Sequence, residues 1–568
     1  MAHSRIMSQV NRAMRIAQFC QQRRIRTSEG LERVAELEHA RHLRLSRRQF
    51  LVGAGAACAG LTLGALPFVD RIQAARTSRA RIAIVGGGLA GLVCAYELQR
   101  KGVLATIYEG NPDRIGGRCH SARGTFPGQV AELGGEMIDN LGKTMLGYAQ
   151  EFKLTRENYG KEPGDPTYYF NGQHYTEREI VDEYRELVNR MRPDLQTLSR
   201  QPTANTHTHT PADVALDRTD LATYLNTRGN GLPLIRAVLG KAYIVEYGRE
   251  LHEQSCLNFL LFIHADRRAK LAEFGVFSDE RYHLVEGNDA VPSQIRSRLQ
   301  GAVEMGAFLQ RLSRNASGQY VLEFKGAASP AIADAVVLAI PYSVLRKVTL
   351  DASLGLSADK QHAINELGYG YNTKTAVGFV GRPWFEQHGR NGASYSDLSN
   401  LQNTWETNYT RATATSILTD YAGGNRARSL GQIPPADGSC FACHGSPNFL
   451  PADLSKAIPQ DQAQRFLTDL DKMFPGAHAA ASRDANGHYA LRRGHWVAQS
   501  YSLGSYSCYL PGQFTSIAGI EGQSAGLLKF AGEHTNSFYE WQGFMEGAAL
   551  SGVAAAGEIL GDMAAGRL

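Results

Sequence analysis

The chain has 568 residues, a formal net charge of +5 and eight cysteines spread over its length. This length predicts two or three structural units rather than one simple core, and the sparse cysteines exclude a disulfide-rich scaffold. The positive excess is concentrated in the first 48 residues, which are crowded with arginine, while the remainder is close to neutral. No basic surface for nucleic acid is therefore implied for the folded body, and we expect no nucleic-acid partner.

The amino-terminal part is predicted to contain an export signal. The segment Ser46-Arg47-Arg48-Gln49-Phe50-Leu51 resembles the twin-arginine motif, and a Gly/Ala-rich apolar run follows it. This run is weakly hydrophobic for a membrane span and is interrupted by Pro67, so we expect residues 46–75 to be a signal peptide cleaved near Ala74-Ala75. An ordinary buried helix is the alternative. The signal implies the twin-arginine translocase as a partner and a periplasmic or secreted bacterial protein.

Residues 1–45 form a basic extension ahead of this motif. They contain two amphipathic helical patterns, at residues 10–20 and 31–43. A mis-assigned start and a chaperone-binding segment both agree with these patterns, and the sequence alone does not assign the extension a role.

The first element of the folded body is a strand, a glycine turn and a helix in direct succession. Residues 82–85 are a short apolar run with β-branched side chains, which indicates a buried strand. Gly86, Gly88 and Gly91 follow with the spacing G-x-G-x-x-G, and apolar residues recur at helical spacing from Leu89. This order is the dinucleotide-binding fingerprint, which places a pyrophosphate at the helix N-terminus. Plain turn chemistry is the alternative for such glycines taken alone.

Three features extend the fingerprint. A second strand ends in Glu109, about 20 residues past the glycines, where an acceptor for a ribose hydroxyl is expected. Gly117 and Arg118 come next, and a guanidinium here can pair with phosphate oxygens. The segment Gly134-Gly135-Glu136 then marks a place where the backbone passes close to a flat group.

With these motifs the sequence resembles the flavin-containing amine oxidase family, the group of monoamine oxidases and L-amino-acid oxidases. The resemblance covers residues 80–568 and implies an α/β fold, in which a Rossmann-like FAD-binding domain of GR2 type is interwoven with an α+β substrate-binding domain. It assigns residues 80–140, 281–340 and 511–568 to the FAD-binding domain. Residues 141–280 become the helical part of the substrate domain, and residues 341–510, with an insertion at 427–455, become its remainder.

The helical part is expected to contain at least four helices and one polar loop. Helical patterns cover residues 144–152, 177–191, 216–225 and 255–263. Residues 200–215 are expected to be a solvated loop. His207 and His209 within this loop have no third ligand nearby, so we expect no metal there.

One lysine stands among small and apolar residues on the strand pattern of residues 369–379. From the residues alone, Lys374 is as readily a surface lysine as a buried one. The resemblance assigns it to the lysine that holds a water against flavin N5, where a buried amine can assist proton traffic.

The resemblance also identifies an aromatic cage and the remaining cofactor contacts. Tyr506 and Phe544 match the two walls of the cage over the flavin, and ordinary core is the alternative for Tyr506. Ser505 stands where monoamine oxidases have their flavin-linked cysteine, which implies non-covalent FAD. Further positions match FAD contacts: Leu309 through its backbone beside the adenine, Gly532 and Glu533 at the ribityl chain and diphosphate, and Met545 at the pyrimidine end of the ring.

The implied reaction removes a hydride from the carbon that carries the amine of a small-molecule amine or L-amino acid. The imine product hydrolyses to a carbonyl compound and ammonia, and the electrons pass to oxygen, giving hydrogen peroxide, or to a carrier protein. A homodimer is compatible with the resemblance. A flavin-binding protein without amine chemistry is an alternative from a different functional class.

Two departures from the family bear on the substrate and the electron acceptor. Met137 stands where several amino-acid oxidases have an arginine for the substrate carboxylate, and Arg493 is a candidate replacement. Cys440, Cys443 and His444 form the C-x-x-C-H pattern of c-type haem attachment. The insertion around them is short for a cytochrome core, so a disulfide, a metal site and a chance pattern stay open. A haem would make the protein a flavocytochrome dehydrogenase.

Overall fold

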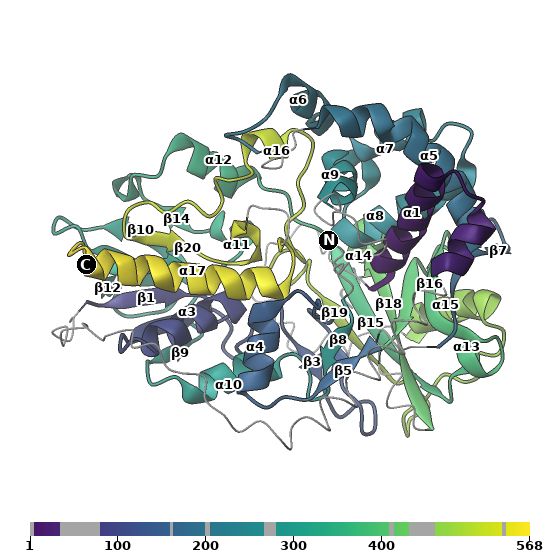
Figure 1. Ribbon diagram of the computed structural model, residues 1–568. Coiled ribbons are helices and arrows are strands. Elements are labelled where there is room, and N and C mark those ends of the chain that lie inside the picture. Colours follow the sequence, from purple (N-terminus) through teal and green to yellow (C-terminus); the bar gives the residue numbers. More distant parts are fainter. Residues whose placement is uncertain are drawn as a thin grey trace, which may run out of the picture.

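The computed structural model describes residues 5–34, 80–159, 163–198, 205–265, 280–407, 414–430, 460–536 and 541–568. Two units lie side by side, each built on its own large sheet (Figure 1). We call them the parallel-sheet unit and the mixed-sheet unit. Parallel strands alternating with helices confirm the predicted α/β class. No helix within the described ranges is long and apolar enough to cross a bilayer.

The parallel-sheet unit is organised around five parallel strands in the order β20-β13-β1-β2-β9. The strands are β1 (Ile82–Val85), β2 (Ala105–Glu109), β9 (Val303–Met305), β13 (Ala335–Leu338) and β20 (Leu528–Phe530). Three distant parts of the sequence therefore meet in one sheet. Ile82 and Ile84 pack into the apolar cluster on one face, and Ala83 and Val85 into the cluster on the other. Both faces of β1 are buried, as expected for a central parallel strand.

Helices cover one face of this sheet and a second sheet covers the other. The helices are α3 (Leu89–Gln99), α4 (Lys143–Glu151), α10 (Ala290–Arg298) and α17 (Met545–Ala564). The second sheet has the order β12-β11-β10-β14 and consists of β10 (Leu309–Arg314), β11 (Tyr320–Phe324), β12 (Ala331–Ala333) and β14 (Thr349–Leu350). A Cβ on Gly552 would lie 2.4 Å from the carbonyl oxygen of Ala90, so α17 approaches α3 at a distance that only glycine permits.

The mixed-sheet unit contains seven strands in the order β19-β15-β18-β17-β16-β6-β7. They are β6 (Asp165–Phe170), β7 (Gln173–Tyr175), β15 (Asn372–Val380), β16 (Arg390–Ser396), β17 (Asn403–Glu406), β18 (Thr415–Gly423) and β19 (Leu491–His495). All neighbours are antiparallel except β6 and β16. Phe379 and Leu418 pack with α13 (Pro383–Glu386) and α15 (Gln460–Met473) on one face.

A layer of helices covers the other face of the mixed sheet. Its members are α5 (Glu177–Thr197), α7 (Leu221–Arg228), α8 (Pro233–Tyr247) and α9 (Leu257–Ala265), whereas the short α6 (Pro211–Asp217) packs against residues 513–516. The α5 helix begins at a capping box, in which Thr176 and Glu179 each accept a hydrogen bond from the backbone N–H of the other. The helices predicted at 144–152, 177–191 and 255–263 are confirmed in place, with ends that differ by up to six residues.

The predicted loop at 200–215 is wrong at its carboxyl end, and the predicted helix at 216–225 is interrupted. Thr210 and Asp213 form a second capping box with Pro211 in the first turn, so α6 starts inside the polar stretch. A new helix then begins after Asp220, whose carboxylate accepts a hydrogen bond from the N–H of Thr223 at 2.8 Å. Polar side chains here cap helices rather than mark a loop.

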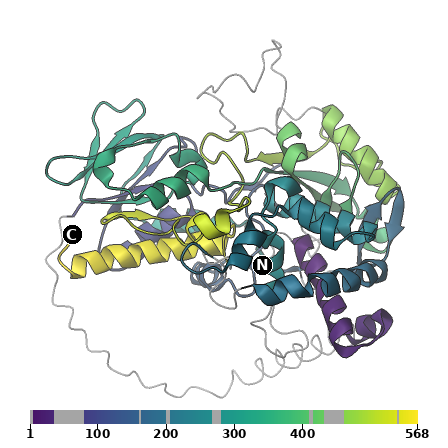
Figure 2. The ribbon, with the colours of Figure 1, turned by 90° about the horizontal axis from the view of Figure 1, so that it is seen from above.

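The basic extension contributes an element of the core. Helix α1 (Arg5–Arg23) lies against α5 and α8 (Figure 2). Ala13, Ile16 and Ala17 on its inner face are fully buried and belong to the same apolar cluster as the helical layer. Arg12 forms an ion pair of 2.8 Å with Glu177. The predicted amphipathic pattern at 10–20 is thus a real helix, and its apolar face is covered by the mixed-sheet unit.

Two short antiparallel ladders lie near the junction of the units. They are β3 (Ser121–Ala122) with β4 (Ala131–Glu132), and β5 (Arg156–Asn158) with β8 (Tyr282–Leu284). The remaining short helices are α11 (Tyr342–Leu345), α12 (Ala358–Glu366), α14 (Gly424–Leu430), α16 (Gln513–Ser516), η2 (Leu251–Glu253), η4 (Ala352–Leu354) and η7 (Glu533–Thr535).

Candidate active site

A cavity lies between the two large sheets. The glycine turn after β1 lines it from one side, and side chains of β15, β17 and β18 line it from the other. The predicted site residues that line it are Gly86, Gly88, Glu109, Gly117, Arg118, Gly134, Gly135, Glu136, Leu309, Lys374, Tyr506, Gly532, Glu533, Phe544 and Met545. The structure therefore brings together residues that lie up to 459 positions apart in the sequence.

Gly91 is the predicted site residue that does not line the cavity, and it contributes instead by allowing α3 to pack closely against the glycine turn. A Cβ at this position would lie 2.0 Å from the carbonyl oxygen of Gly86. Gly86 itself has φ of 109°, in the region that favours glycine. These two glycines allow the chain to turn sharply from β1 into α3. The first N–H groups of α3 consequently face the cavity, where a pyrophosphate can bind.

Glu109 closes the nucleotide end of the cavity. Its carboxylate accepts hydrogen bonds from the backbone N–H of Gly87 at 2.6 Å and of Asn111 at 2.7 Å. Burial raises the pKa of this carboxyl, and the two N–H donors lower it in part. A carboxylate held by backbone donors at the end of the second strand fits a ribose acceptor, so this end of the cavity suits a dinucleotide.

Arg118 and Glu533 connect two cavity walls. The Arg118 guanidinium donates to the carboxylate of Glu533 and to the carbonyl of Ser505, both at 2.8 Å. Glu533 also accepts from the Ser507 hydroxyl at 2.7 Å and from the N–H of Gly543 at 2.8 Å. Nearby positive charge and these donors outweigh burial and lower the pKa of Glu533, although burial alone would raise it. The pair fixes the segments that meet in the middle of the cavity.

Lys374 is buried, so its interpretation as a surface lysine is wrong. Its Nζ donates to the Glu136 carboxylate at 2.6 Å and to the carbonyl of Gly134 at 2.9 Å. The Trp405 indole donates to the other oxygen of Glu136 at 3.0 Å, and the lysine Nζ lies 5.2 Å from the Trp405 ring centroid. Glu136 thus accepts two donors and neutralises Lys374 within the cavity wall.

Aromatic side chains surround the end of the cavity near Lys374. Tyr506 and Phe544 line it, as do Trp405 and Tyr421. The Tyr421 and Tyr506 hydroxyls lie 3.0 Å apart, and Tyr506 also donates to the carbonyl of Glu246. Burial raises the pKa of Tyr506 well above its usual value, so the phenol is neutral at physiological pH. Neutral aromatic walls suit a small apolar group beside an amine.

Trp405 and Tyr421 were not predicted. Tyr421 is the direct partner of Lys374 in the antiparallel register of β15 and β18, so both side chains lie on one face. Trp405 reaches the same face from β17. No local motif marks either residue, and only the long-range pairing of these strands brings them to the cavity. Arg114 was also missed; it lines the nucleotide end and lies 5.8 Å from the Trp496 ring centroid.

Arg493 does not line the cavity, which argues against its role as a carboxylate clamp. Its guanidinium donates to Thr375 at 2.9 Å, Gln462 at 2.6 Å and the carbonyl of Leu430 at 3.1 Å. Burial lowers the pKa of Arg493 to about 10. Met137 does line the cavity.

Several predictions fall on residues outside the described ranges. Cys440, Cys443 and His444 are among them, as is the signal at 46–75. Within the described part of the chain, no three His, Cys, Asp or Glu side chains are grouped so as to hold a metal ion.

The chain matches the family model described as flavin-containing amine oxidoreductase over residues 89–438 and 448–560. The chain belongs to this family. Residues 439–447, which include the C-x-x-C-H pattern, fall between the two matched segments. Membership of this family identifies a flavin amine oxidase that carries out FAD-dependent oxidative deamination. It does not favour a haem-linked dehydrogenase or a non-catalytic flavoprotein.

Relatives of known name agree with this family. The flavin-dependent L-tryptophan oxidase RebO of Lentzea aerocolonigenes is 27% identical over 383 residues, covering 63% of this chain and 78% of the relative. The L-amino-acid oxidase of Siganus canaliculatus is 24% identical over 496 residues, covering 84% and 85%. That of Vipera ammodytes ammodytes is 21% identical over 492 residues, covering 84% and 92%.

Solved structures of the family share the fold of this flavin amine oxidase. Cyclohexylamine oxidase from Brevibacterium oxydans superposes with a TM-score of 0.67 at 18% identity, covering 85% of this chain and 99% of the other. Putrescine oxidase bound to putrescine gives a TM-score of 0.66 at 17% identity with the same coverage. At these identities the likeness establishes the fold alone.

Proposed function

We propose that the enzyme oxidises a primary amine that carries no carboxylate on the reacting carbon, with oxygen as the electron acceptor. The substrate amine enters neutral between the aromatic walls, and Lys374 holds a water close to the reacting centre. Bound FAD supplies the hydride-accepting ring. The imine leaves the cavity and hydrolyses to an aldehyde or ketone and ammonia.

The observation that carries the proposal is the charge at the substrate end of the cavity. Lys374 is the cation there among the described lining residues, and Glu136 neutralises it at 2.6 Å. Arg114 lies near Glu109 at the nucleotide end, and Arg118 is paired with Glu533 in the middle of the cavity. Burial raises the pKa of the Tyr421 phenol, and the nearby carboxyls of Glu246, Glu280 and Glu136 raise it further. A site whose one cation is already paired offers no partner to a substrate carboxylate, so it suits a neutral amine better than an amino acid.

A peroxide-release assay over matched substrate pairs tests this proposal. The pairs differ only in the carboxylate: tryptamine with L-tryptophan, phenethylamine with L-phenylalanine, and cadaverine with L-lysine. We expect kcat/KM to favour the amine member of each pair that reacts. Peroxide from the amino acids alone would contradict it.

An L-amino-acid substrate is the second candidate, because the named sequence relatives are L-tryptophan and L-amino-acid oxidases. An amino-acid substrate would need a cation to bind its carboxylate, and this cation must be a residue other than Arg493 and Lys374, which are already bonded to protein groups. Preference for the amino-acid member of a pair would support this candidate.

We also propose that FAD is bound without a covalent link. Ser505 replaces the cysteine of monoamine oxidases, and its hydroxyl donates to Asn372 at 2.6 Å. Cys508 does not line the cavity, and burial raises the pKa of Cys119, which does line it, to about 12. A thiol so reluctant to ionise is a poor nucleophile. Acid denaturation should therefore release all yellow chromophore into the supernatant, and retention on the protein would refute this point.

Export to the periplasm by the twin-arginine translocase is proposed from the motif at residues 46–51. The test is a fusion of residues 1–79 to a reporter enzyme that requires export. Replacing both Arg47 and Arg48 by Lys should keep the reporter in the cytoplasm. Export of the double variant at the normal level would exclude this route.

A further inference from the structure

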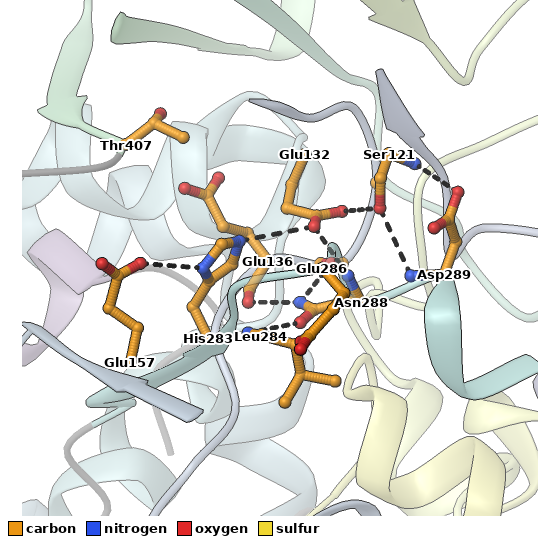
Figure 3. A network of polar contacts seen from close by, with 12 residues as sticks. Ser121, Glu132, Glu136, Glu157, His283, Leu284, Glu286, Asn288, Asp289 and Thr407 are labelled. Carbon is orange, nitrogen blue, oxygen red and sulfur yellow. Dashed lines mark hydrogen bonds and ion pairs between the residues drawn. The ribbon is translucent and has the colours of Figure 1, made fainter. Parts of the chain in front are cut away.

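A buried network of polar side chains lies behind the Glu136 turn (Figure 3). At its centre His283 of β8 stands between Glu132 of β4 and Glu157 of β5. Its Nε2 lies 3.4 Å from the Glu132 carboxylate, and its Nδ1 lies 3.5 Å from the Glu157 carboxylate. The His283 side chain is 1% exposed. The network therefore joins the two short ladders at the junction of the units.

The charge of His283 balances two buried carboxylates. Burial lowers the pKa of His283, but Glu132, Glu157 and Glu136 raise it more, and the result is a pKa of about 9. The only ring packed against the imidazole within the described residues is Tyr159, whose centroid is 5.7 Å away. The imidazole is therefore a cation at neutral pH, and its loss of a proton would leave two anions unbalanced in the protein interior.

Glu132 passes this constraint to the active-site turn. Its carboxylate accepts the Ser121 hydroxyl and the N–H of Asn288, both at 2.8 Å. The amide of Asn288 then donates to the carbonyl oxygens of Gly135, at 3.0 Å, and of Glu136, at 2.5 Å. Asn288 thus fixes the backbone of Glu136, the residue whose carboxylate pairs with Lys374.

We propose that His283 is a positioning residue for the reaction: through Glu132 and Asn288 it fixes the Gly135-Glu136 turn, and so sets the place of the Lys374 ammonium in the cavity. This inference rests on the role proposed for Lys374. It adds to that role a buried counter-ion that neither touches the substrate nor lines the cavity.

The first test compares His283→Gln with His362→Gln, a change at an exposed histidine of α12. The full-length enzyme with FAD bound is titrated from pH 6 to 11, recording turnover and near-ultraviolet circular dichroism, to which Trp405 contributes. Wild type and His362→Gln should show an alkaline transition near pH 9 in both signals. His283→Gln should lack it and turn over about tenfold to a hundredfold more slowly. A wild-type transition in His283→Gln would overturn the proposal.

Glu157→Gln provides a test that does not require His283→Gln to fold. It removes one carboxylate that raises the pKa of His283 and keeps the shape of the side chain. Its alkaline transition should therefore occur at a lower pH than in wild type. A transition at the wild-type pH would overturn the proposal.

A double-mutant cycle separates this inference from the role of Lys374. If His283 acts through the lysine, adding His283→Gln to Lys374→Met should slow turnover less than twofold further. Fully multiplicative losses would show that His283 does not act through Lys374. If Lys374 has no role in the reaction, the single variant Lys374→Met will turn over at the wild-type rate, and this outcome is distinguishable from a failure of the His283 proposal.

Discussion

At the scale of single residues, the decisive contact is the ion pair between Lys374 and Glu136. A lone buried ammonium is costly, and a carboxylate 2.6 Å away removes that cost. The pair leaves the lysine with one donor directed at the Gly134 carbonyl and keeps it against the Trp405 ring. Its position in the wall is thus set by three neighbours rather than by the substrate.

Lys374→Met should leave FAD bound and slow the reaction of the reduced enzyme with oxygen by about a hundredfold, because the proton traffic at that position is lost. Stopped-flow absorbance at the flavin band measures this rate. Lys347→Met, at an exposed lysine, is the control. Unchanged reoxidation would remove Lys374 from the mechanism.

Tyr506 distinguishes a cage wall from ordinary core. Tyr506→Phe keeps the ring and loses the hydroxyl contact with Tyr421, so turnover should stay within about threefold of wild type. Tyr506→Ala removes the wall and should lower kcat/KM at least tenfold through poorer orientation of the amine. Steady-state peroxide assays measure both. Equal turnover in Tyr506→Ala and wild type would mean that the residue only fills space.

The site residues that could be predicted from sequence lie in motifs a few residues long. Glu109 follows the glycine turn at a fixed interval, and Gly134-Gly135-Glu136 carries its own pattern. Trp405 and Tyr421 could not be predicted, because they reach the cavity through the pairing of β18 with β15 and of β17 with β18. The partnership of Glu136 with Lys374 was hidden for the same reason: 238 positions separate them.

At the scale of elements, the turn from β1 into α3 depends on contacts that no side chain can enter. Gly91→Ala would place a methyl group 2.0 Å from the Gly86 carbonyl oxygen, with backbone rather than a flexible side chain in the way. We expect a loss of about 1 to 3 kcal/mol of stability and weaker FAD binding. Thermal unfolding and the FAD dissociation constant measure these effects.

Gly557→Ala is the matched control for Gly91→Ala. Gly557 is exposed on α17, and a Cβ there would meet nothing within 4 Å. Alanine in a helix interior is favoured over glycine by about 1 kcal/mol, so stability should rise slightly. Similar losses in both variants would show that the close approach at Gly91 is not the cause.

Helix boundaries show where sequence patterns were misread. The stretch before α6 is polar, which favoured a loop, yet Thr210-Pro211 and Asp213 carry the spacing of a capping box. The cue was present in the sequence and was outweighed by the neighbouring histidines and threonines. Apolar periodicity predicted α4 and α5, which each bury one face, whereas α3 follows the glycine fingerprint and is buried on nearly all sides.

At the scale of the whole molecule, two buried histidines set opposite limits on stability with pH. The pKa of His283 is raised from 6.5 to about 9, so its contribution is complete below pH 6.5 and is lost as pH rises through 9. This shift corresponds to roughly 3 kcal/mol. Burial lowers the pKa of His534 to about 3, so its contribution is present above pH 6.5 and is lost as pH falls toward 3.

The unfolding temperature should therefore be highest near neutral pH and fall on both sides. Differential scanning calorimetry from pH 4 to 10 measures the profile. His283→Gln should flatten the alkaline side and leave the acid side unchanged, while His362→Gln should leave both sides as in wild type. If the unfolding temperature of His283→Gln still falls steeply at alkaline pH, another group causes the alkaline loss of stability.

The interwoven architecture was predicted from the family resemblance, which matched segments such as the apolar run of β13 and Pro341 to a crossing between the domains. The position of α1 in the fold could not be predicted from the sequence. Its amphipathic pattern shows that it needs a partner, but an amphipathic helix fits many apolar surfaces. The specific fit comes from distant groups, such as the ion pair of Arg12 with Glu177 and the hydrogen bond from the Gln21 amide to the Arg185 carbonyl at 3.2 Å.

The docking of α1 changes what removal of an export signal would mean for this enzyme. A peptidase cut near Ala74-Ala75 would not discard the residues ahead of it, since Ala13, Ile16 and Ala17 are buried in the core. The cut would nick the polypeptide and leave a short peptide clamped to a long one. The product of one gene would then run as two bands on a denaturing gel and elute as a single species from a sizing column.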